Sequence, residues 1–554
     1  MGCGMVWRKR LLWGVLILAA VGALAYSQRL LLLQYSLGWY TDWNFPRGPE
    51  QPIAWQAGPA QAATPAAQRP PNIIVILADD LGFNDITAYG GGRADWGVPT
   101  PHIDRIAQQG VRFDTGYAPS AICTISRAAL LTGRYPWRFG LEFTPTPGPL
   151  ARVAGQLFTG EPPVHIDLDT ASRVPKFNDL GMPAEEVTLA EVLRQRGYHT
   201  VHIGKWHLGS TPVMRPNAQG FDESLFLESG LYLRRDDPRA VNAVQEFDPM
   251  DRFMWPNMRF GVSYNAGAWF EPRRYLTDYF TDQAVQVIER NRHRPFFLYL
   301  AHWAVHTPLQ ASREDYEALP KHLGHRERVY GAMIRSLDRS VGRVLDSLRE
   351  QGLLDNTLVI FTSDNGGPHS LGISSLNRPF RGWKLSFFEG GIRVPYLAQW
   401  PARIRPGQVL QTPVSGMDVF ATAAAAAAAP LPKDRPIDAQ DWLPWLQAGA
   451  RAPERPLHWR DGPYRALREQ DWKLIVSARP QRDWLFNLAQ DPTEQHDLSD
   501  REPSRVAAMK ARMAAHHQGM PAPMWPSFIQ VPVTIDKTLD QPSSAQDVHT
   551  YWYN

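Results

Sequence analysis

The chain has 554 residues, of which 44% are hydrophobic and 20% are charged. This composition supplies enough apolar material for a large core, and it excludes a wholly disordered chain, a coiled coil and a multi-span transporter. The formal net charge of +3, with no basic run beyond the first ten residues, gives no support to nucleic-acid binding. The two cysteines, Cys3 and Cys123, exclude a fold that depends on a framework of disulfides.

The first residues have the pattern of a targeting segment. A basic stretch at 8–10 precedes an uncharged apolar run at 11–25, as in a signal sequence. Small residues at 23–25 are typical of a cleavage site, whereas the leucines and aromatic residues that follow favour an uncleaved membrane tether through 11–33. We expect an exported protein, periplasmic or extracellular, in which residues 1–26 are either a signal peptide or a membrane anchor.

Four apolar, β-branched runs predict strands that are buried on both faces of a mostly parallel sheet. They span residues 72–78, 198–203, 296–300 and 357–362, and Asp, Asn, Lys or His follows each of them. In open α/β sheets, ligands bind at the carboxyl ends of the strands. The sequence therefore predicts one polar site along one edge of the sheet.

The sequence changes in character after about residue 430. Short apolar runs separated by turn residues over 455–490 predict a small antiparallel sheet, and 505–517 predict a terminal helix. The expected organisation is a signal peptide or anchor over 1–26, a linker over 27–70, a catalytic domain over 71–430, a small subdomain over 431–520 and an extended tail over 521–554.

Oxygen-bearing side chains follow two of the predicted strands. Asp79 and Asp80 come after the first strand, and Asp364 and Asn365 come after the fourth. Three carboxylates and one amide carbonyl suit Ca²⁺ or Mg²⁺ better than zinc. Acids packed this closely would repel each other without a cation, so the pattern indicates a metal site.

Positively charged and imidazole side chains accompany these acids. Lys205 and His207 follow the second strand, His306 follows the third, and Lys384 follows the fourth. Cations beside a metal are typical of a site for an anion with several oxygens, such as a sulfate or phosphate group.

Cys123 is the candidate nucleophile. It precedes Arg127 and an apolar helical run that Gly133 ends. A helix N-terminus and a nearby arginine favour an anionic group at this position.

Five ordered motifs together resemble the type I, formylglycine-dependent sulfatases of the alkaline-phosphatase-like superfamily. They are Ile-Leu-Ala-Asp-Asp-Leu-Gly at 76–82, the segment from Cys123 to Arg134, Gly-Lys-Trp-His-Leu-Gly at 204–209, Ser-Asp-Asn-Gly-Gly at 363–367, and Lys384 before Glu389-Gly-Gly-Ile-Arg-Val-Pro at 389–395. The resemblance covers roughly residues 71–500. It implies a large, mostly parallel mixed sheet flanked by helices, with a small C-terminal antiparallel subdomain.

The resemblance also implies a mechanism. A formylglycine-generating enzyme would oxidise Cys123 to formylglycine, whose hydrate would attack a sulfate ester. Asp79, Asp80, Asp364 and Asn365, together with the modified Cys123, would hold Ca²⁺, with Mg²⁺ the less favoured ion.

The remaining site residues take their roles from the same resemblance. Arg127 would steady the formylglycine, and Lys205 and Lys384 would bind the sulfate. His207 would assist the hydrate, and His306 would help to protonate the leaving oxygen. Ser229 is the nearest candidate for a serine that the family has further along the chain.

One position departs from the family. Ile125 stands where the modification signal Cys-x-Pro-x-Arg has its proline. An unmodified Cys123 would leave a weak phosphoesterase or a silent binder of sulfated ligands, and a phosphonate monoester or phosphodiester hydrolase is the alternative enzyme. The substrate is expected to be a sulfated small molecule or glycan, because the long loops at 140–185 and 230–275 carry no motif that distinguishes the two.

Overall fold

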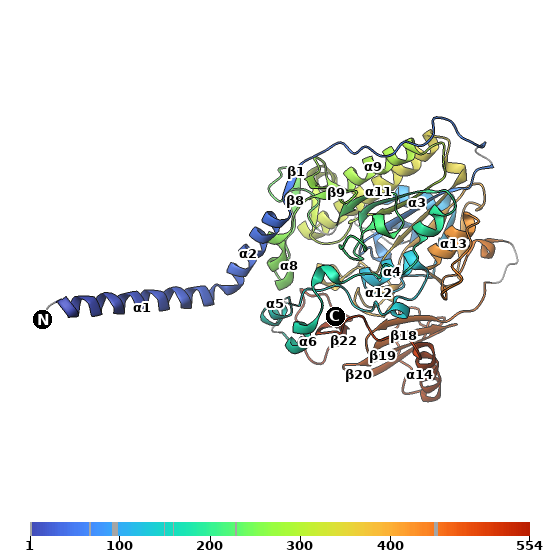
Figure 1. The fold of residues 1–554 in the computed structure, drawn as a ribbon. Coiled ribbons are helices and arrows are strands. Elements are labelled where there is room, and N and C mark those ends of the chain that lie inside the picture. The colour runs from blue at the N-terminus through green and yellow to red at the C-terminus, as the bar shows by residue number, and fades with distance from the viewer. Residues whose placement is uncertain are drawn as a thin grey trace.

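A computed structural model of the chain describes residues 3–65, 68–90, 98–148, 150–158, 160–227, 230–447 and 452–554. An 11-stranded mixed sheet forms its centre (Figure 1). In spatial order its strands are β1 (Arg47–Pro49), β10 (Trp269–Glu271), β9 (Val262–Tyr264), β7 (Glu223–Leu227), β6 (His199–Lys205), β11 (Phe296–Ala301), β2 (Asn72–Ala78), β13 (Thr357–Ser363), β14 (Tyr396–Gln399), β3 (Val111–Phe113) and β15 (Gln408–Leu410). The central strands from β7 to β13 all run parallel.

Strand β2 shows why the central strands are apolar at almost every position. Ile73, Val75 and Leu77 pack into the hydrophobic core on one face of the sheet. The alternate residues, Ile74 and Ile76, pack into a second core on the other face. Successive side chains point to opposite faces, and both faces are covered, so the strand is apolar at every position after Asn72.

Helices cover both faces of the sheet (Figure 1). One core contains residues of α4 (Cys123–Thr132), α7 (Leu189–Arg194) and α13 (Asp418–Ala426). The other contains residues of α3 (Pro101–Gln108), α9 (Leu276–Arg290) and α11 (His325–Glu350). The predicted α/β architecture is confirmed.

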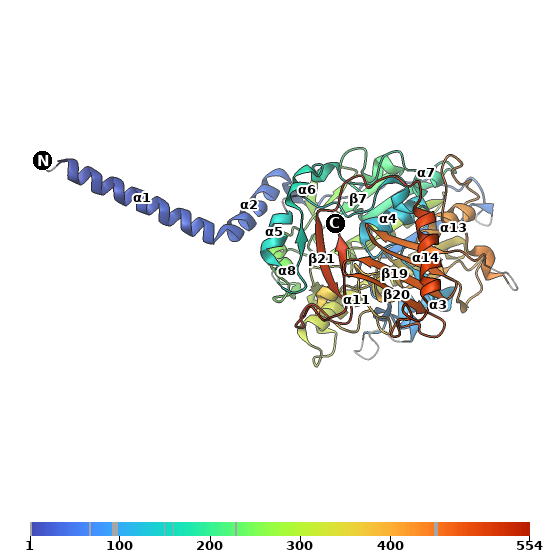
Figure 2. The same ribbon diagram turned by 90° about the horizontal axis from the view of Figure 1, so that it is seen from below.

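A second sheet has four antiparallel strands and faces the viewer in Figure 2. It consists of β17 (Leu457–Asp461), β18 (Tyr464–Glu469), β19 (Trp472–Ala478) and β20 (Gln481–Asn487). Helix α14 (Pro503–His517) packs Met509 and Met513 against Leu467, Leu474 and Leu485 of this sheet. The predicted small antiparallel sheet is therefore present.

The last residues differ from the expected extended tail. Strands β21 (Ile529–Thr534) and β22 (His549–Tyr553) pair with each other, and β21 pairs with β5 (His165–Ile166). The prolines around them hid the alternation of apolar and polar residues over 529–534, which is a strand pattern. The end of the described chain thus returns to the body of the protein.

Short elements connect the larger ones. They are the helices α5 (Leu150–Leu157), α6 (Leu168–Arg173), α8 (Pro249–Met254), α10 (Arg313–Glu317) and α12 (Glu389–Ile392), and the paired strands β8 (Ala240–Asn242) with β12 (Gln310–Ser312) and β4 (Gly116–Tyr117) with β16 (Val414–Ser415).

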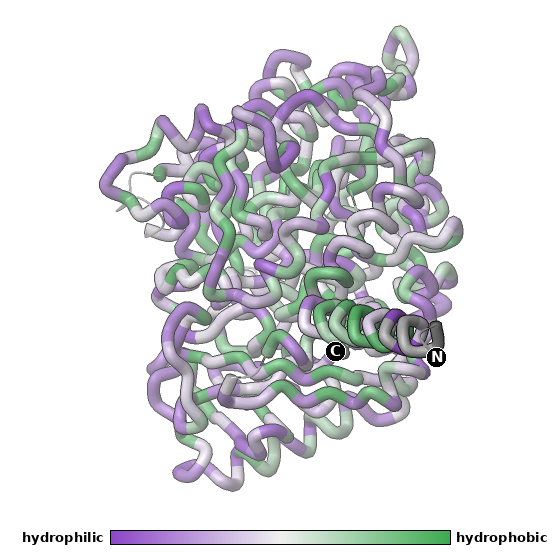
Figure 3. The backbone as a smooth tube through the Cα atoms, turned by 90° about the vertical axis from the view of Figure 1, so that its left-hand side faces the viewer, coloured by the Kyte–Doolittle hydropathy of each residue, from purple (hydrophilic) through white to green (hydrophobic). Residues whose placement is uncertain are grey.

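Two helices precede the sheet, in the region expected to hold a targeting segment and the start of a linker. Helix α1 (Cys3–Ser27) projects away from the body and is largely apolar (Figures 1 and 3). Its stretch Arg10–Ser27 is long and apolar enough to cross a membrane, and none of it is buried in the protein. Helix α2 (Arg29–Asn44) returns to the body, where Asp42 pairs with Arg259 at 2.6 Å.

Candidate active site

The carboxyl ends of the central parallel strands bring the predicted site residues together. Asp79 and Asp80 follow β2, and Lys205 is the last residue of β6. One candidate ligand atom from each of Asp79, Asp80, Cys123 and His306 lies within 4.8 Å of the other three. The strand ends therefore form one polar site, as the strand pattern predicted.

Cys123 is the first residue of α4 and is only 3% exposed. Its Sγ lies 3.5 Å from Asp79 Oδ1 and 3.7 Å from Asp80 Oδ1. Burial, followed by the negative charge of Asp364, raises the pKa of the Cys123 thiol well above its ordinary value. The expectation that the helix N-terminus and Arg127 make this cysteine anionic is thus wrong for the unmodified thiol, because burial, together with the charge of Asp364, outweighs them.

Arg127 lies one turn further along α4 and is completely buried. Its Nε donates to Asp364 Oδ2 at 2.9 Å, and one of its terminal nitrogens lies 3.3 Å from Asp79 Oδ2. Its other terminal nitrogen donates to the carbonyl of Lys205 at 3.0 Å. Arg127 therefore fixes the acids that follow β2 and β13 and ties them to the end of β6.

Two lysines, the buried Lys205 and the half-buried Lys384, face the first pair of acids. Lys205 Nζ lies 2.7 Å from Asp79 Oδ2, and Lys384 Nζ lies 2.7 Å from Asp80 Oδ1. Burial by itself raises the pKa of Asp79 and Asp80, but the lysines offset burial and hold the pKa of each acid below its ordinary value. Both acids are therefore carboxylates at neutral pH.

His306 stands at the rim of this cluster. Its Nδ1 contacts the carbonyl of Thr307 at 2.6 Å, so Nδ1 carries the proton and donates it. Its Nε2 faces inward, 3.4 Å from Lys384 Nζ and 3.5 Å from Asp80 Oδ2. By contrast, His302 is fully buried behind the rim, with its Nε2 2.9 Å from Ser340 Oγ, and burial lowers its pKa to about 3.

His207 and Asp80 have unusual backbone conformations. Their φ angles are 62° and 61°, in the left-handed region that residues with a side chain seldom occupy. Within the described chain, His207 Nδ1 is buried and has no hydrogen-bond partner. Such backbone conformations cluster at ligand sites, where the surrounding structure holds them in place.

Gly204 allows β6 to deliver Lys205 to the site. Its φ is 112°, and a Cβ atom at this position would lie 1.9 Å from the carbonyl oxygen of Ala301. Only glycine permits this approach of β6 to β11.

The donors at the strand ends fit a hard cation. Asp79 and Asp80 supply carboxylate oxygens, and Asn365 Oδ1 is buried without a hydrogen-bond partner among the described residues. Asp364 lies beside them, with its Oδ1 3.2 Å from the backbone nitrogen of Asp80. Oxygen donors of this kind are the ligands that Ca²⁺ and Mg²⁺ prefer.

The Glu389 motif lies away from this cluster. Lys473 of β19 pairs with Glu389 at 2.7 Å and with Glu494 at 2.8 Å, and all three side chains are fully buried. This triad attaches the antiparallel sheet to the main body. Ser229 lies outside the described residues.

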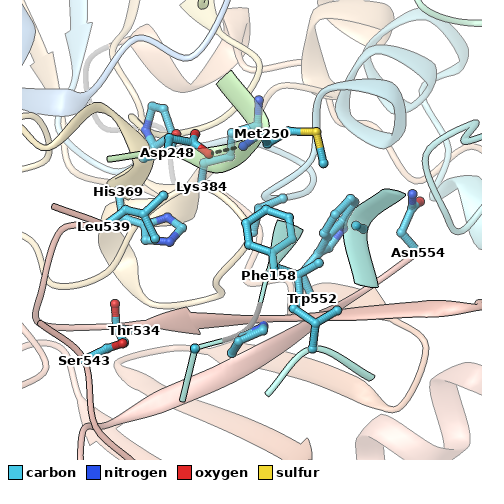
Figure 4. A pocket seen from close by; sticks show the side chains of 18 of the residues that line it. Phe158, Asp248, Met250, His369, Lys384, Thr534, Leu539, Ser543, Trp552 and Asn554 are labelled. Atoms are coloured by element: carbon cyan, nitrogen blue, oxygen red, sulfur yellow. Dashed lines mark hydrogen bonds between the residues drawn. The ribbon is translucent and has the colours of Figure 1, made fainter. Parts of the chain in front are cut away.

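A cavity of about 370 Å³ opens beside Lys384 (Figure 4). Asp80, His306 and Lys384 line one part of it. Thr307, Leu385 and residues 368–370 add to it, and most of the remaining lining comes from segments in which the sequence showed no motif, namely 146–164, 248–250 and 529–554. Local patterns did not reveal this wall, because it forms only when segments almost 400 residues apart come together.

The comparisons with known proteins agree with this geometry. The family model described as Sulfatase matches residues 71–429. Steryl-sulfatase of Mus musculus is 32% identical over 86% of this chain and 88% of its own length. N-acetylgalactosamine-6-sulfatase of Sus scrofa is 36% identical over 72% of this chain and 69% of its own.

A solved structure of Ps i-CgsB in complex with k-i-k-neocarrahexaose superposes with a TM-score of 0.68 at 30% identity, covering 82% of this chain and 95% of that one. A phosphonate monoester hydrolase of Agrobacterium radiobacter shares the fold at a TM-score of 0.55 and 17% identity. The family match covers more than half of the chain, and the two curated relatives are sulfatases. This chain belongs to the sulfatase family and is a sulfuric ester hydrolase.

Proposed function

We propose that this sulfatase cleaves sulfate esters with a formylglycine made from Cys123 and with a bound Ca²⁺. The observation that carries the proposal is the meeting of Cys123 with Asp79 and Asp80, because Sγ lies within 3.7 Å of an oxygen of each acid. A buried thiol with a raised pKa is a poor nucleophile, so the site needs a different group at this position.

Formylglycine would supply a hydrated aldehyde whose hydroxyl attacks sulfur, and Ca²⁺ would supply a positive charge that offsets negative charge on that hydroxyl and on the sulfate oxygens. Asp79, Asp80, Asp364 and Asn365 would hold the cation. Arg127 keeps two of these carboxylates in place through its contacts with Asp364 and Asp79. Mg²⁺ is the less favoured ion, because it requires a stricter octahedral geometry.

The lysines and histidines would act on the substrate. Lys205 and Lys384 place two ammonium groups beside the strand ends, where they would bind the sulfate oxygens. His306 points its Nε2 into the cavity mouth, 3.4 Å from Lys384 Nζ, and Nε2 would take a proton from this ammonium group and pass it to the leaving oxygen. His207 would assist the hydrate, consistent with its unpartnered Nδ1 among the described groups.

The proposal includes a location and a partner. The apolar helix α1 favours export, followed either by signal cleavage or by anchoring, to a periplasmic or extracellular site. A formylglycine-generating enzyme would have to act on Cys123 before the fold closes, because the side chain is only 3% exposed. The substrate would be a sulfated small molecule or glycan, since the names of the curated relatives point to both a sterol and an amino sugar.

The deciding experiment compares purified wild-type protein with Cys123→Ala on 4-nitrophenyl sulfate, after mass analysis of the peptide that contains residue 123. The aldehyde mass in the active protein, and folded but inactive Cys123→Ala, would support the proposal. Full activity of a protein whose residue 123 is an unmodified thiol would refute it.

A further inference from the structure

The cavity beside the strand ends has an apolar wall. Leu150 and Phe158 contribute to it from the α5 region, Met250 from α8, Ile529 and Val531 from β21, and Trp552 from β22. Val531 and Trp552 are paired across these two strands. A volume of about 370 Å³ lies within the range of pockets that enclose a ligand of drug size.

This wall belongs to a small hydrophobic cluster of its own. The cluster is centred on Ala151, Ala154 and Phe528, which are buried. Phe158, Met250 and Val531 pack against it but remain only partly buried. Their uncovered apolar area faces a cavity, where an apolar ligand would remove it from water.

The charges around the cavity argue against a polyanionic ligand. Among the described lining residues, Lys384 is the only lysine or arginine, and it pairs with Asp80. Glu161 and Asp248 add two acids to the wall. Burial lowers the pKa of His369 to about 4, so His369 is neutral at pH 7. A glycan with several sulfates would find one cation in this pocket.

The polar side chains on the wall largely bond to the protein itself. Thr538 Oγ1 lies 2.7 Å from Asp540 Oδ1, and Ser543 Oγ donates to the carbonyl of Glu161 at 2.7 Å. Thr534 Oγ1 donates to the carbonyl of Lys537 at 3.1 Å. A sugar ring, which needs many hydrogen bonds, therefore finds few free groups here. Three groups of the lining, His369 Nδ1, Trp552 Nε1 and Asn554 Oδ1, are buried without a partner among the described residues.

We infer that the alcohol part of the substrate is large and apolar, and that it lies against the wall formed by Phe158, Met250, Val531 and Trp552 while its sulfate faces Lys384. This inference rests on the proposed function and adds the class of substrate to it. Residues outside the catalytic motifs would then determine which alcohol the protein accepts. His369 would bond a polar group on the alcohol.

Binding of the free alcohol tests the inference without the catalytic step. A tetracyclic sterol and a hexose are titrated into the purified protein, and tryptophan fluorescence is measured. We expect the sterol to bind at least tenfold more tightly than the hexose. We also expect Val531→Asp to weaken sterol binding at least tenfold, because it places a charge in the apolar wall. Equal binding of the two alcohols, or sterol binding unchanged by Val531→Asp, would overturn the inference.

Kinetics with sulfate esters provide the second measurement. We expect Phe158→Ala to lower kcat/KM for a steryl sulfate about tenfold more than it lowers kcat/KM for 4-nitrophenyl sulfate, since a lost hydrophobic contact costs about 10–200-fold in discrimination. Equal losses of kcat/KM on the two esters would contradict the role of the apolar wall in binding the alcohol. If Val531→Asp does not fold, Phe158→Ala carries both the binding test and the kinetic test.

Matched controls carry the same substitutions on exposed residues outside the cavity. They are Val409→Asp, at a side chain that is 49% exposed, and Phe177→Ala, at one that is 39% exposed. Both should leave sterol binding unchanged. Failure of the proposed function would appear differently, as intact sterol binding without turnover of 4-nitrophenyl sulfate.

Discussion

Lys384 and Asp80 form a partly buried ion pair of 2.7 Å between residues that lie 304 positions apart in the chain. The pair joins the loop after β13 to the end of β2, and it places His306 Nε2 3.4 Å from the same ammonium group. The lysine thus contacts both a proposed metal ligand and the proposed proton donor. Asp80, Lys384 and His306 therefore belong to one network of polar contacts.

Ile125 leads to a prediction about modification of Cys123. Ile125 is the third residue of α4, and the first backbone bond of this helix is donated by Ser126 to Ile122. A proline at 125 therefore loses no helical hydrogen bond. We expect Ile125→Pro to keep the fold and to raise the fraction of Cys123 converted to formylglycine, as measured by peptide mass spectrometry. Leu130→Pro, in the interior of the same helix, should unfold the protein.

Metal removal should lower both activity and stability. After treatment with a chelator, added Ca²⁺ should raise the thermal midpoint, because a ligand at 100 times its Kd stabilises the folded state by about 2.7 kcal/mol. Asn365→Ala removes one oxygen donor without changing the charge, and it should weaken this response. Asn257→Ala, at a half-buried site elsewhere, should respond to Ca²⁺ as wild type does. Stoichiometric zinc in the purified protein would contradict the assignment.

The proposed proton donor can be separated from its neighbour by the choice of leaving group. His306→Ala should lower kcat about 10²–10⁴-fold for esters of poor leaving groups, and less for 4-nitrophenyl sulfate, whose oxygen needs little protonation. His302→Ala should lower stability, because His302 bonds to Ser340 behind the site. Its effect on kcat should be the same for both esters. Equal losses in His306→Ala on good and poor leaving groups would transfer the role to Lys384.

The triad that attaches the antiparallel sheet should be important for stability. Lys473→Met leaves Glu389 and Glu494 facing each other in a fully buried site. Removing one partner from a buried ion pair costs about 3–5 kcal/mol. Chemical unfolding should show this loss, whereas Lys510→Met, which breaks the exposed pair with Asp483, should cost less than about 1 kcal/mol.

The N-terminal helix should decide where the protein resides. If α1 is an anchor, the wild-type protein should sediment with membranes and resist extraction with alkaline carbonate. Leu16→Arg combined with Leu18→Arg should release it, because charges near the centre of a membrane span are unfavourable. Leu16→Ile combined with Leu18→Ile is the matched control. A mature protein that begins after residue 25 would instead show signal cleavage.

Much of the site was predictable because strand ends are local features. Apolar runs such as 72–78 end at polar residues, and parallel strands bring those residues to one edge. The environment of Cys123 was not predictable, since its pKa depends on burial and on the carboxylates that arrive from β13 and β2. The wall residues Phe158 and Val531 also escaped prediction, because no periodic pattern links α5 to β21. Sequence patterns indicate which face of a helix or strand is buried, but they do not indicate which distant segments come into contact.

The pocket wall has a consequence for biosynthesis. Strands β21 and β22 complete it, and they are among the last described residues to leave the ribosome. All the proposed catalytic residues, up to Lys384, emerge earlier, so the reacting centre can assemble on a nascent chain whose substrate-selecting wall is still missing. A chain truncated before residue 529 would then retain the reacting residues without the surface that chooses the alcohol. If the proposed wall selects the alcohol, changes in β21 and β22 would alter substrate choice while the chemistry stays the same.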